Sequence, residues 1–257
     1  PSGTQNGFRP SIEEYLGSSE EGRRLLLLSN PCNPTGQTRS GAELQALVDA
    51  ASYGETGLLV DEAYEFFHDQ PVSALAHISD LENSNLFVCG AATKGLQAPG
   101  IRVGWVVAAK NHIETLGNFA SFGMGGVSHL SQNYAVELLE PERTELARRA
   151  VSAYYGEMRD RYGEALEAMG LKLHSGNGGF YHWCELPDGM TAAGLNRKLF
   201  ESGAAILEGT DCDMARRGPE SPLATFFRFS FGPLDPSTFD EDMTILRSAL
   251  ESERVPS

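Results

Sequence analysis

Three short apolar segments constrain the fold of this chain more than any other feature. Leu25–Leu28, Gly57–Val60 and Leu86–Cys89 each end directly in polar or turn-forming residues. Apolar runs of this length bounded by turn signals are typical of buried strands in a parallel sheet. A helix that begins after Ser40 would supply the right-handed crossover between the first two strands. We therefore predict an α/β fold with a mostly parallel sheet flanked by helices.

The polar residues that follow these strands form one expected site. They lie at 29–36, 61–64 and 90–94. In open α/β sheets, ligands bind outside the carboxyl ends of the strands, so an amide, a carboxylate, a phenol and an amine would face a common ligand. This set suits pyridoxal phosphate, because a lysine can hold the aldehyde as a Schiff base and a buried aspartate can keep the pyridine nitrogen protonated.

Four motifs in a fixed order resemble a known family. They are Asn-Pro-Cys-Asn-Pro-Thr-Gly (30–36), Asp-Glu-Ala-Tyr (61–64), Thr-Lys-Gly-Leu-Gln-Ala-Pro-Gly-Ile-Arg-Val-Gly-Trp (93–105) and Arg-Phe-Ser-Phe-Gly (228–232). Together they resemble the class I/II aminotransferases among the fold-type I pyridoxal-phosphate enzymes. The resemblance implies an aminotransferase-like fold. It assigns residues 1–140 to part of the large cofactor-binding domain, and 141–257 to a connecting helix and a small α+β carboxyl-terminal domain.

The resemblance also implies the site residues and the cofactor, pyridoxal 5'-phosphate. Lys94 would form the Schiff base and shuttle the substrate's α-proton. Asp61 would pair with the pyridinium nitrogen, and Arg228 would bind the substrate carboxylate. The implied set is Lys94, Asp61 and Tyr64 for catalysis, Asn33, Asp61, Tyr64, Thr93, Lys94 and Arg102 for cofactor binding, and Arg228 with Asn33 for the substrate.

The chemistry favours these residue types independently of the family. A nearby carboxylate keeps a pyridine nitrogen protonated, so that the ring can accept the electrons left by proton loss. Lys94 must be partly neutral to act as nucleophile and base, which burial beside cationic groups would favour. Arg228 matches the planar, bidentate geometry of a carboxylate. Taken singly, Asp61 could be only a helix cap, Arg102 a surface ion-pair partner, and Arg228 a structural cation.

Three departures from the family pattern bear on activity. Ala91 stands where many relatives have a phosphate-binding serine, and Glu208 stands where relatives often have a proline, which places a charge near the expected substrate entrance. Only residues 1–29 precede the first motif, and they contain no glycine loop to cradle a phosphate. We therefore expect tight cofactor binding to need a further amino-terminal segment or a second polypeptide.

Two classes of function follow. The first is a pyridoxal-phosphate enzyme, foremost an aminotransferase acting on an α-amino acid, with elimination, cyclisation or oxidation as alternatives because peripheral residues choose the fate of the common carbanion. The second is a non-catalytic regulatory protein on the same fold. The glycine-rich segment 122–127 approaches the neighbouring subunit in relatives, so the resemblance implies a homodimer.

Composition limits the partners. A net charge of −15 over 257 residues argues against binding nucleic acid or an anionic membrane. The four cysteines and six histidines show no metal-ligand spacing, so we expect no metal site and reduced thiols in a cytoplasmic protein. The expected small-molecule partners are an amino acid and a keto acid.

Overall fold

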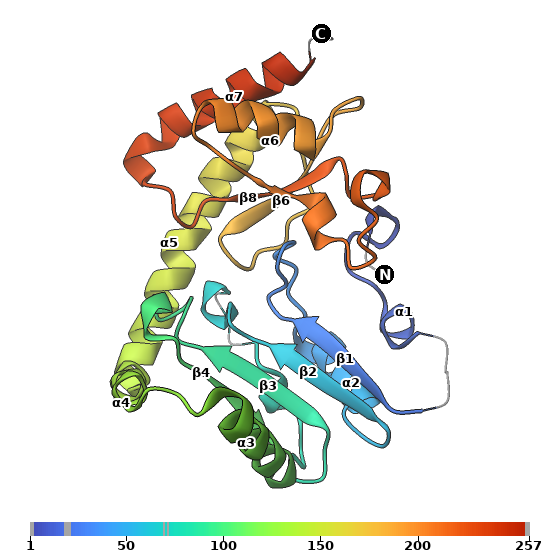
Figure 1. The fold of residues 1–257 in the computed structure, drawn as a ribbon, viewed down its shortest axis with the longest axis vertical. Helices are drawn as coiled ribbons and strands as arrows, with labels where there is room; N and C mark the ends of the chain where they lie inside the picture. The colour runs from blue at the N-terminus through green and yellow to red at the C-terminus, as the bar shows by residue number, and fades with distance from the viewer. Residues whose placement is uncertain (1–2, 18–21, 69, 71, 255–257) are drawn as a thin grey trace. The chain divides into compact units, whose positions relative to one another are not determined.

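The computed structural model of the chain describes residues 3–17, 22–68, 70 and 72–254 (Figure 1). The chain forms two compact units. The first contains residues 1–33, 37–153 and 177–179, and the second contains 34–36, 154–176 and 180–257. The predicted division into residues 1–140 and 141–257 concerns the functions of the segments and stays a prediction.

The sheet of the first unit has the order β1-β2-β3-β4. The strands are β1 (Arg24–Ser29), β2 (Thr56–Asp61), β3 (Leu86–Ala91) and β4 (Gly104–Ala108). The first three are parallel, which confirms the predicted mostly parallel sheet, whereas β4 is antiparallel to β3. The connection between β3 and β4 contains no crossover helix, so the chain turns back directly, as an antiparallel pair allows.

Helix α2 (Gly41–Ala51) covers one face of this sheet. Leu44, Leu47 and Val48 are fully buried there, at the spacing that places side chains on one face of a helix. They pack with alternate residues of the three parallel strands, including Leu58. The side chain of Ser40 occupies the position before the helix but makes no capping hydrogen bond, so the predicted cap is correct in position only.

The amino-terminal segment packs beside β1. It contains the short helix α1 (Ile12–Leu16), whose Tyr15 hydroxyl donates a hydrogen bond to the Leu27 carbonyl. Along β1, Leu28 faces the core while Leu25 and Leu27 are 56% and 64% exposed. Among the described strands, β1 lies at the edge of the sheet. The face of β1 opposite Leu28 therefore exposes two apolar side chains, Leu25 and Leu27.

Two helices follow β4. Helix α4 (His129–Leu138) is capped by Ser128, which accepts a hydrogen bond from the Ser131 amide at 3.3 Å. The sequence patterns did not predict α3 (Lys110–Met124), which contains no buried residue. The apolar side chains of both helices are largely exposed, with Phe122 at 94% and Leu130 at 81%. No helix in the described part of the chain is long and apolar enough to cross a membrane.

Helix α5 (Pro141–Ala168) begins with a proline, a residue favoured at the first helical position, and contributes to both units. The second unit has an antiparallel sheet in the order β5-β6-β8-β7. Its elements are β5 (Lys172–Leu173), β6 (Tyr181–Glu185), α6 (Ala192–Glu201), β7 (Leu207–Glu208), β8 (Phe226–Ser230) and α7 (Phe239–Arg254). Tyr162, Phe227, Leu195 and Leu246 meet in its core. This arrangement confirms the predicted small α+β part.

The two faces of the sheet in the first unit should differ in their tolerance of truncation. Leu47→Ala should lower the free energy of unfolding by about 2–5 kcal/mol, because it removes a fully buried side chain. The matched variant Leu27→Ala should change it by less than about 0.5 kcal/mol, because that side chain is 64% exposed. Urea denaturation of both variants measures the difference, and equal losses would contradict this packing.

Candidate functional site

The carboxyl ends of the three parallel strands lie side by side. Ser29, the last residue of β1, pairs with Asp61 of β2, which in turn pairs with Cys89 of β3. The loops that leave these strands therefore begin at one edge of the sheet. The sequence predicted this convergence.

The loop after β1 is closed by Asn30. This side chain is completely buried. Its Oδ1 accepts a hydrogen bond from the Arg39 amide at 2.7 Å, and its Nδ2 donates to the Arg39 carbonyl at 3.0 Å. The Cys32 amide also donates to the Gln37 carbonyl at 2.8 Å. Asn33 lies within this closed loop and is exposed, so its amide is accessible to a ligand.

Strand β2 ends with Asp61, whose carboxylate is exposed. Its Oδ1 accepts a hydrogen bond from the Ala63 amide at 3.0 Å. Successive residues of a strand face opposite sides, so the burial of Val60 against the core puts Asp61 on the other face. The expectation of a buried aspartate at this position was wrong for the chain as described, and the buried carboxyl is that of Glu62.

Glu62 connects the ends of the strands to the next loop. It is 4% exposed, its Oε1 accepts a hydrogen bond from the Ala74 amide at 2.7 Å, and its own amide donates to the Cys89 carbonyl at 2.8 Å. The pKa of Glu62 is raised to about 7, mainly by burial and to a smaller extent by the nearby charges of Glu65 and Asp61. Glu62 is therefore a structural acid beside the exposed Asp61.

The loop after β3 carries Lys94. The Ala98 amide donates to the Ala92 carbonyl at 3.0 Å, and the Gln97 amide donates to the Lys94 carbonyl at 3.1 Å. Gln97 and Arg102 have φ values of 51° and 56°, an uncommon backbone conformation for residues with a side chain. The loop is thus a tightly turned segment.

The structure brings Lys94 and Tyr64 together. Lys94 is half-buried, and its Nζ lies 5.8 Å from the centroid of the Tyr64 ring. Tyr64 is 8% exposed. Thr93 lies beside the lysine and is half-buried, while Arg102 is exposed and donates from Nη1 to the Pro99 carbonyl at 3.0 Å.

Arg228 belongs to the second unit, so the structure describes it apart from the other predicted residues. It lies on β8, half-buried, with its guanidinium 5.4 Å from the centroid of the Tyr181 ring. Glu208 on β7 accepts a hydrogen bond at Oε1 from the Asn196 side chain at 3.0 Å. Asn196 thus contacts the Glu208 carboxylate, and the place of this carboxylate near a substrate entrance stays a prediction.

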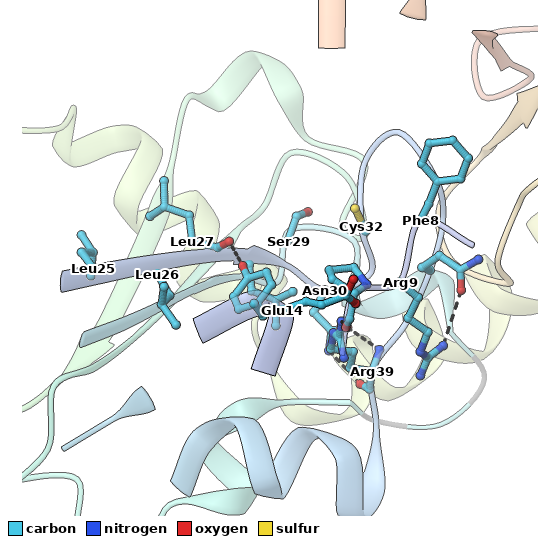
Figure 2. A pocket seen from close by; sticks show the side chains of 14 residues that line it. Phe8, Arg9, Glu14, Leu25, Leu26, Leu27, Ser29, Asn30, Cys32 and Arg39 are labelled. Atoms are coloured by element: carbon cyan, nitrogen blue, oxygen red, sulfur yellow. Dashed lines mark hydrogen bonds between the residues drawn. The ribbon is translucent and has the colours of Figure 1, made fainter. Parts of the chain in front are cut away.

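A pocket of about 420 Å³ lies along β1 (Figure 2). Figure 2 shows Leu25 and Leu27 on one side of this strand and Leu26 on the other. Residues of the amino-terminal segment and of the loop after β1 complete the lining, among them Tyr15, whose pKa burial raises to about 12. None of the predicted site residues lines this pocket.

The donor set at the strand ends fits pyridoxal phosphate. An amine, a phenol and an accessible carboxylate lie on neighbouring loops of one unit, and an accessible amide and guanidinium lie on loops of the same unit. These are the groups that the aldehyde, the ring oxygen, the ring nitrogen and the phosphate require.

Sequence reasoning missed three residues that contact one another next to these loops. Glu65 and Phe66 follow the Asp-Glu-Ala-Tyr motif directly, and Arg148 of α5 contacts both of them. The motif pointed to the neighbourhood of the first two. Nothing in the spacing of α5 distinguished Arg148 from the helix's exposed arginines.

Glu62 should make stability depend on pH. The pKa of Glu62 rises from 4.5 to about 7 on folding, so its stabilising contribution is complete below pH 4.5 and is lost as the pH rises through 7. Glu62→Gln keeps an acceptor for the Ala74 amide, and should be more stable than the wild type at pH 8 by on the order of 1–3 kcal/mol. The two proteins should converge near pH 4.5.

Chemical denaturation at several pH values measures this difference. The exposed residue Glu55 supplies the control variant, Glu55→Gln, which should show no such trend. A constant difference between Glu62→Gln and the wild type across this range would rule out a titrating, buried Glu62.

Comparison with known proteins identifies the family. The family model for aminotransferase class I and II matches residues 4–242. An aspartate aminotransferase from Pyrococcus abyssi is 26% identical over 222 residues, which cover 85% of this chain and 57% of that protein. A 1-aminocyclopropane-1-carboxylate synthase from Oryza sativa subsp. indica is 26% identical over 276 residues, covering 96% of this chain and 54% of that protein.

A solved structure of an aminotransferase has a similar fold. The structure of an aminotransferase from Mycobacterium tuberculosis has a TM-score of 0.81 and 25% identity, covering 98% of this chain and 63% of its own. The chain thus spans somewhat more than half the length of the relatives it matches. Because the family model extends over most of the chain, the chain belongs to the class I and II aminotransferase family.

Proposed function

We propose that this chain acts as a pyridoxal-phosphate-dependent aminotransferase on an α-amino acid, with Lys94 as the residue that carries the cofactor. The observation that carries the proposal is the approach of the Lys94 Nζ to Tyr64 at the edge where the strand ends of Asp61 and Cys89 pair. The family match supports it.

Each residue would then have a distinct task. The bound cofactor supplies an electron-accepting ring. The Lys94 amine forms the covalent link and moves the α-proton. The Asp61 carboxylate holds a proton on the ring nitrogen, and Tyr64 and Asn33 donate to the ring oxygen. The remaining proposed contacts are those of Thr93 and Arg102 with the phosphate, and of Arg228 and Asn33 with the substrate.

The apolar surface of α3 and α4 supports a homodimer. Phe119, Phe122 and Leu130 are each at least 75% exposed, which is unusual for the surface of a monomer. We propose that a second copy of the chain covers them in a cytoplasmic dimer. Phe122→Asp should convert the dimer to a monomer in sedimentation experiments. An unchanged mass for that variant would argue against this face as the interface.

The exposed leucines on one face of β1 support a further packing partner. Leu25 and Leu27 are exposed there, and the relatives are longer than the part that this chain matches. We propose that additional polypeptide, fused or separate, packs on the face of β1 that carries Leu25 and Leu27, and strengthens cofactor binding. Titration of pyridoxal phosphate with and without that polypeptide tests this, and equal affinities would overturn it.

A second candidate reaction has a specific observation in its favour. One relative of similar identity is named a 1-aminocyclopropane-1-carboxylate synthase rather than an aminotransferase. A ring-closing or elimination reaction on the same carbanion is therefore the alternative. Identification of products by mass from panels of amino acids and keto acids separates the two, since only transamination yields a new amino acid from the added keto acid.

The covalent role of Lys94 gives the sharpest test. When the chain is treated with pyridoxal phosphate and borohydride, we expect a stable cofactor adduct on the peptide that contains Lys94, because this amine lies beside the site's phenol. Lys94→Ala should abolish the adduct and all turnover. Lys110→Ala removes an exposed lysine of the same unit and should change neither. A dominant adduct on another lysine would refute the assignment.

A further inference from the structure

The loops after β2 and β3 meet at one close contact. Phe66, which is 4% exposed, lies in the loop after β2, and Gly95 directly follows Lys94 in the loop after β3. A Cβ atom placed on Gly95 would lie 2.6 Å from the Phe66 ring, closer than real Cβ contacts come. The ring therefore occupies the space where a side chain at position 95 would be, and it fixes the backbone next to Lys94.

Arg148 holds the same ring from helix α5. Its guanidinium carbon lies 4.7 Å from the Phe66 ring centroid, within the range of a cation–π contact. Its Nη2 lies 3.6 Å from the Glu65 Oε2, so one arginine contacts two consecutive residues of the loop. The side chains of Arg148 and Glu65 are 16% and 25% exposed. Water thus screens these contacts less than it would on an open surface.

The loop after β2 needs such a support because it has little internal structure. Glu65–Phe67 forms a single 3₁₀ turn, and short turns of this kind have poorer hydrogen-bond geometry than an α-helix. The aromatic ring of Phe66 is packed from the helix side by Arg148 and meets the lysine loop at Gly95. A displacement of this ring would therefore reach Lys94 through a single residue.

We propose that Arg148 is a positioning residue for Lys94. It acts through Phe66 and Gly95 and sets the approach of the Lys94 amine to Tyr64. The proposal rests on the proposed function, in which Lys94 carries the cofactor. An arginine suits this role better than a lysine, because its planar guanidinium can stack on a ring and pair with a carboxylate at once.

The experiment measures how fast pyridoxal phosphate and cyanoborohydride modify Lys94 in the full chain, with peptide masses read in the same digest for the exposed Lys110 as an internal reference. Arg148→Met should slow modification of Lys94 by roughly three- to thirtyfold relative to Lys110, as the loss of a desolvated cation–π contact allows. Arg148→Lys should recover part of the rate. Arg149→Met removes the neighbouring arginine, which is 68% exposed, and should have no effect.

A second variant tests the same stack from the opposite side. Gly95→Ala should also slow modification of Lys94, because the new methyl group must displace the Phe66 ring while Arg148 stays in place. Gly100→Ala is the matched control, since a Cβ atom at that position meets nothing within 4 Å. Thermal melting of every variant shows that the measured chains are folded at the assay temperature.

The outcomes separate the two proposals. Slower modification of Lys94 in both Arg148→Met and Gly95→Ala, with Lys110 unchanged, is the expected result. Normal modification of Lys94 in both variants would overturn the positioning role and leave the proposed function standing. A wild-type chain without an adduct on Lys94 would overturn both. Equal changes at Lys94 and Lys110 would show a general loss of structure and would also overturn the positioning role.

Discussion

The arrangement of the site depends on the register of three parallel strands. Ser29, Asp61 and Cys89 pair across β1, β2 and β3, so their loops leave one edge of the sheet together. A shift of one residue would turn every side chain of a strand to the opposite face. Such a shift would bury Asp61 in place of Val60. The core would lose an apolar side chain, and the Asp61 carboxylate would no longer be accessible. The same strand pairing therefore determines both the core between α2 and the sheet and the arrangement of the loops at the carboxyl ends of the strands.

Two adjacent carboxyl groups, those of Asp61 and Glu62, lie in different environments at the end of β2. Asp61 is exposed at the end of β2, whereas Glu62 is buried and accepts a hydrogen bond from the Ala74 amide. Burial raises the pKa of Glu62 to about 7, so this side chain is a poor permanent anion but a good structural acceptor. The Asp61 side chain, by contrast, is accessible to a ligand.

The sequence predicted those features that depend on local patterns. Apolar runs predicted the three strands, and the position of Ser40 predicted the start of the crossover helix α2. It did not predict α3, because the apolar residues of that helix face no core in this chain. The exposure of Asp61 depends on which face of β2 packs against the core. The contact of Arg148 with Phe66 joins residues 82 positions apart. No periodicity in one sequence reports such long-range contacts.

The central claim is that Asp61 serves the ring nitrogen of a cofactor carried by Lys94. The most direct measurement is the ¹⁵N chemical shift of the ring nitrogen in pyridoxal phosphate trapped on Lys94 by borohydride, because a covalent adduct needs no tight binding. The account predicts a protonated ring nitrogen at neutral pH in the wild type, and a deprotonated one in Asp61→Asn. The same protonation state in both proteins would contradict it.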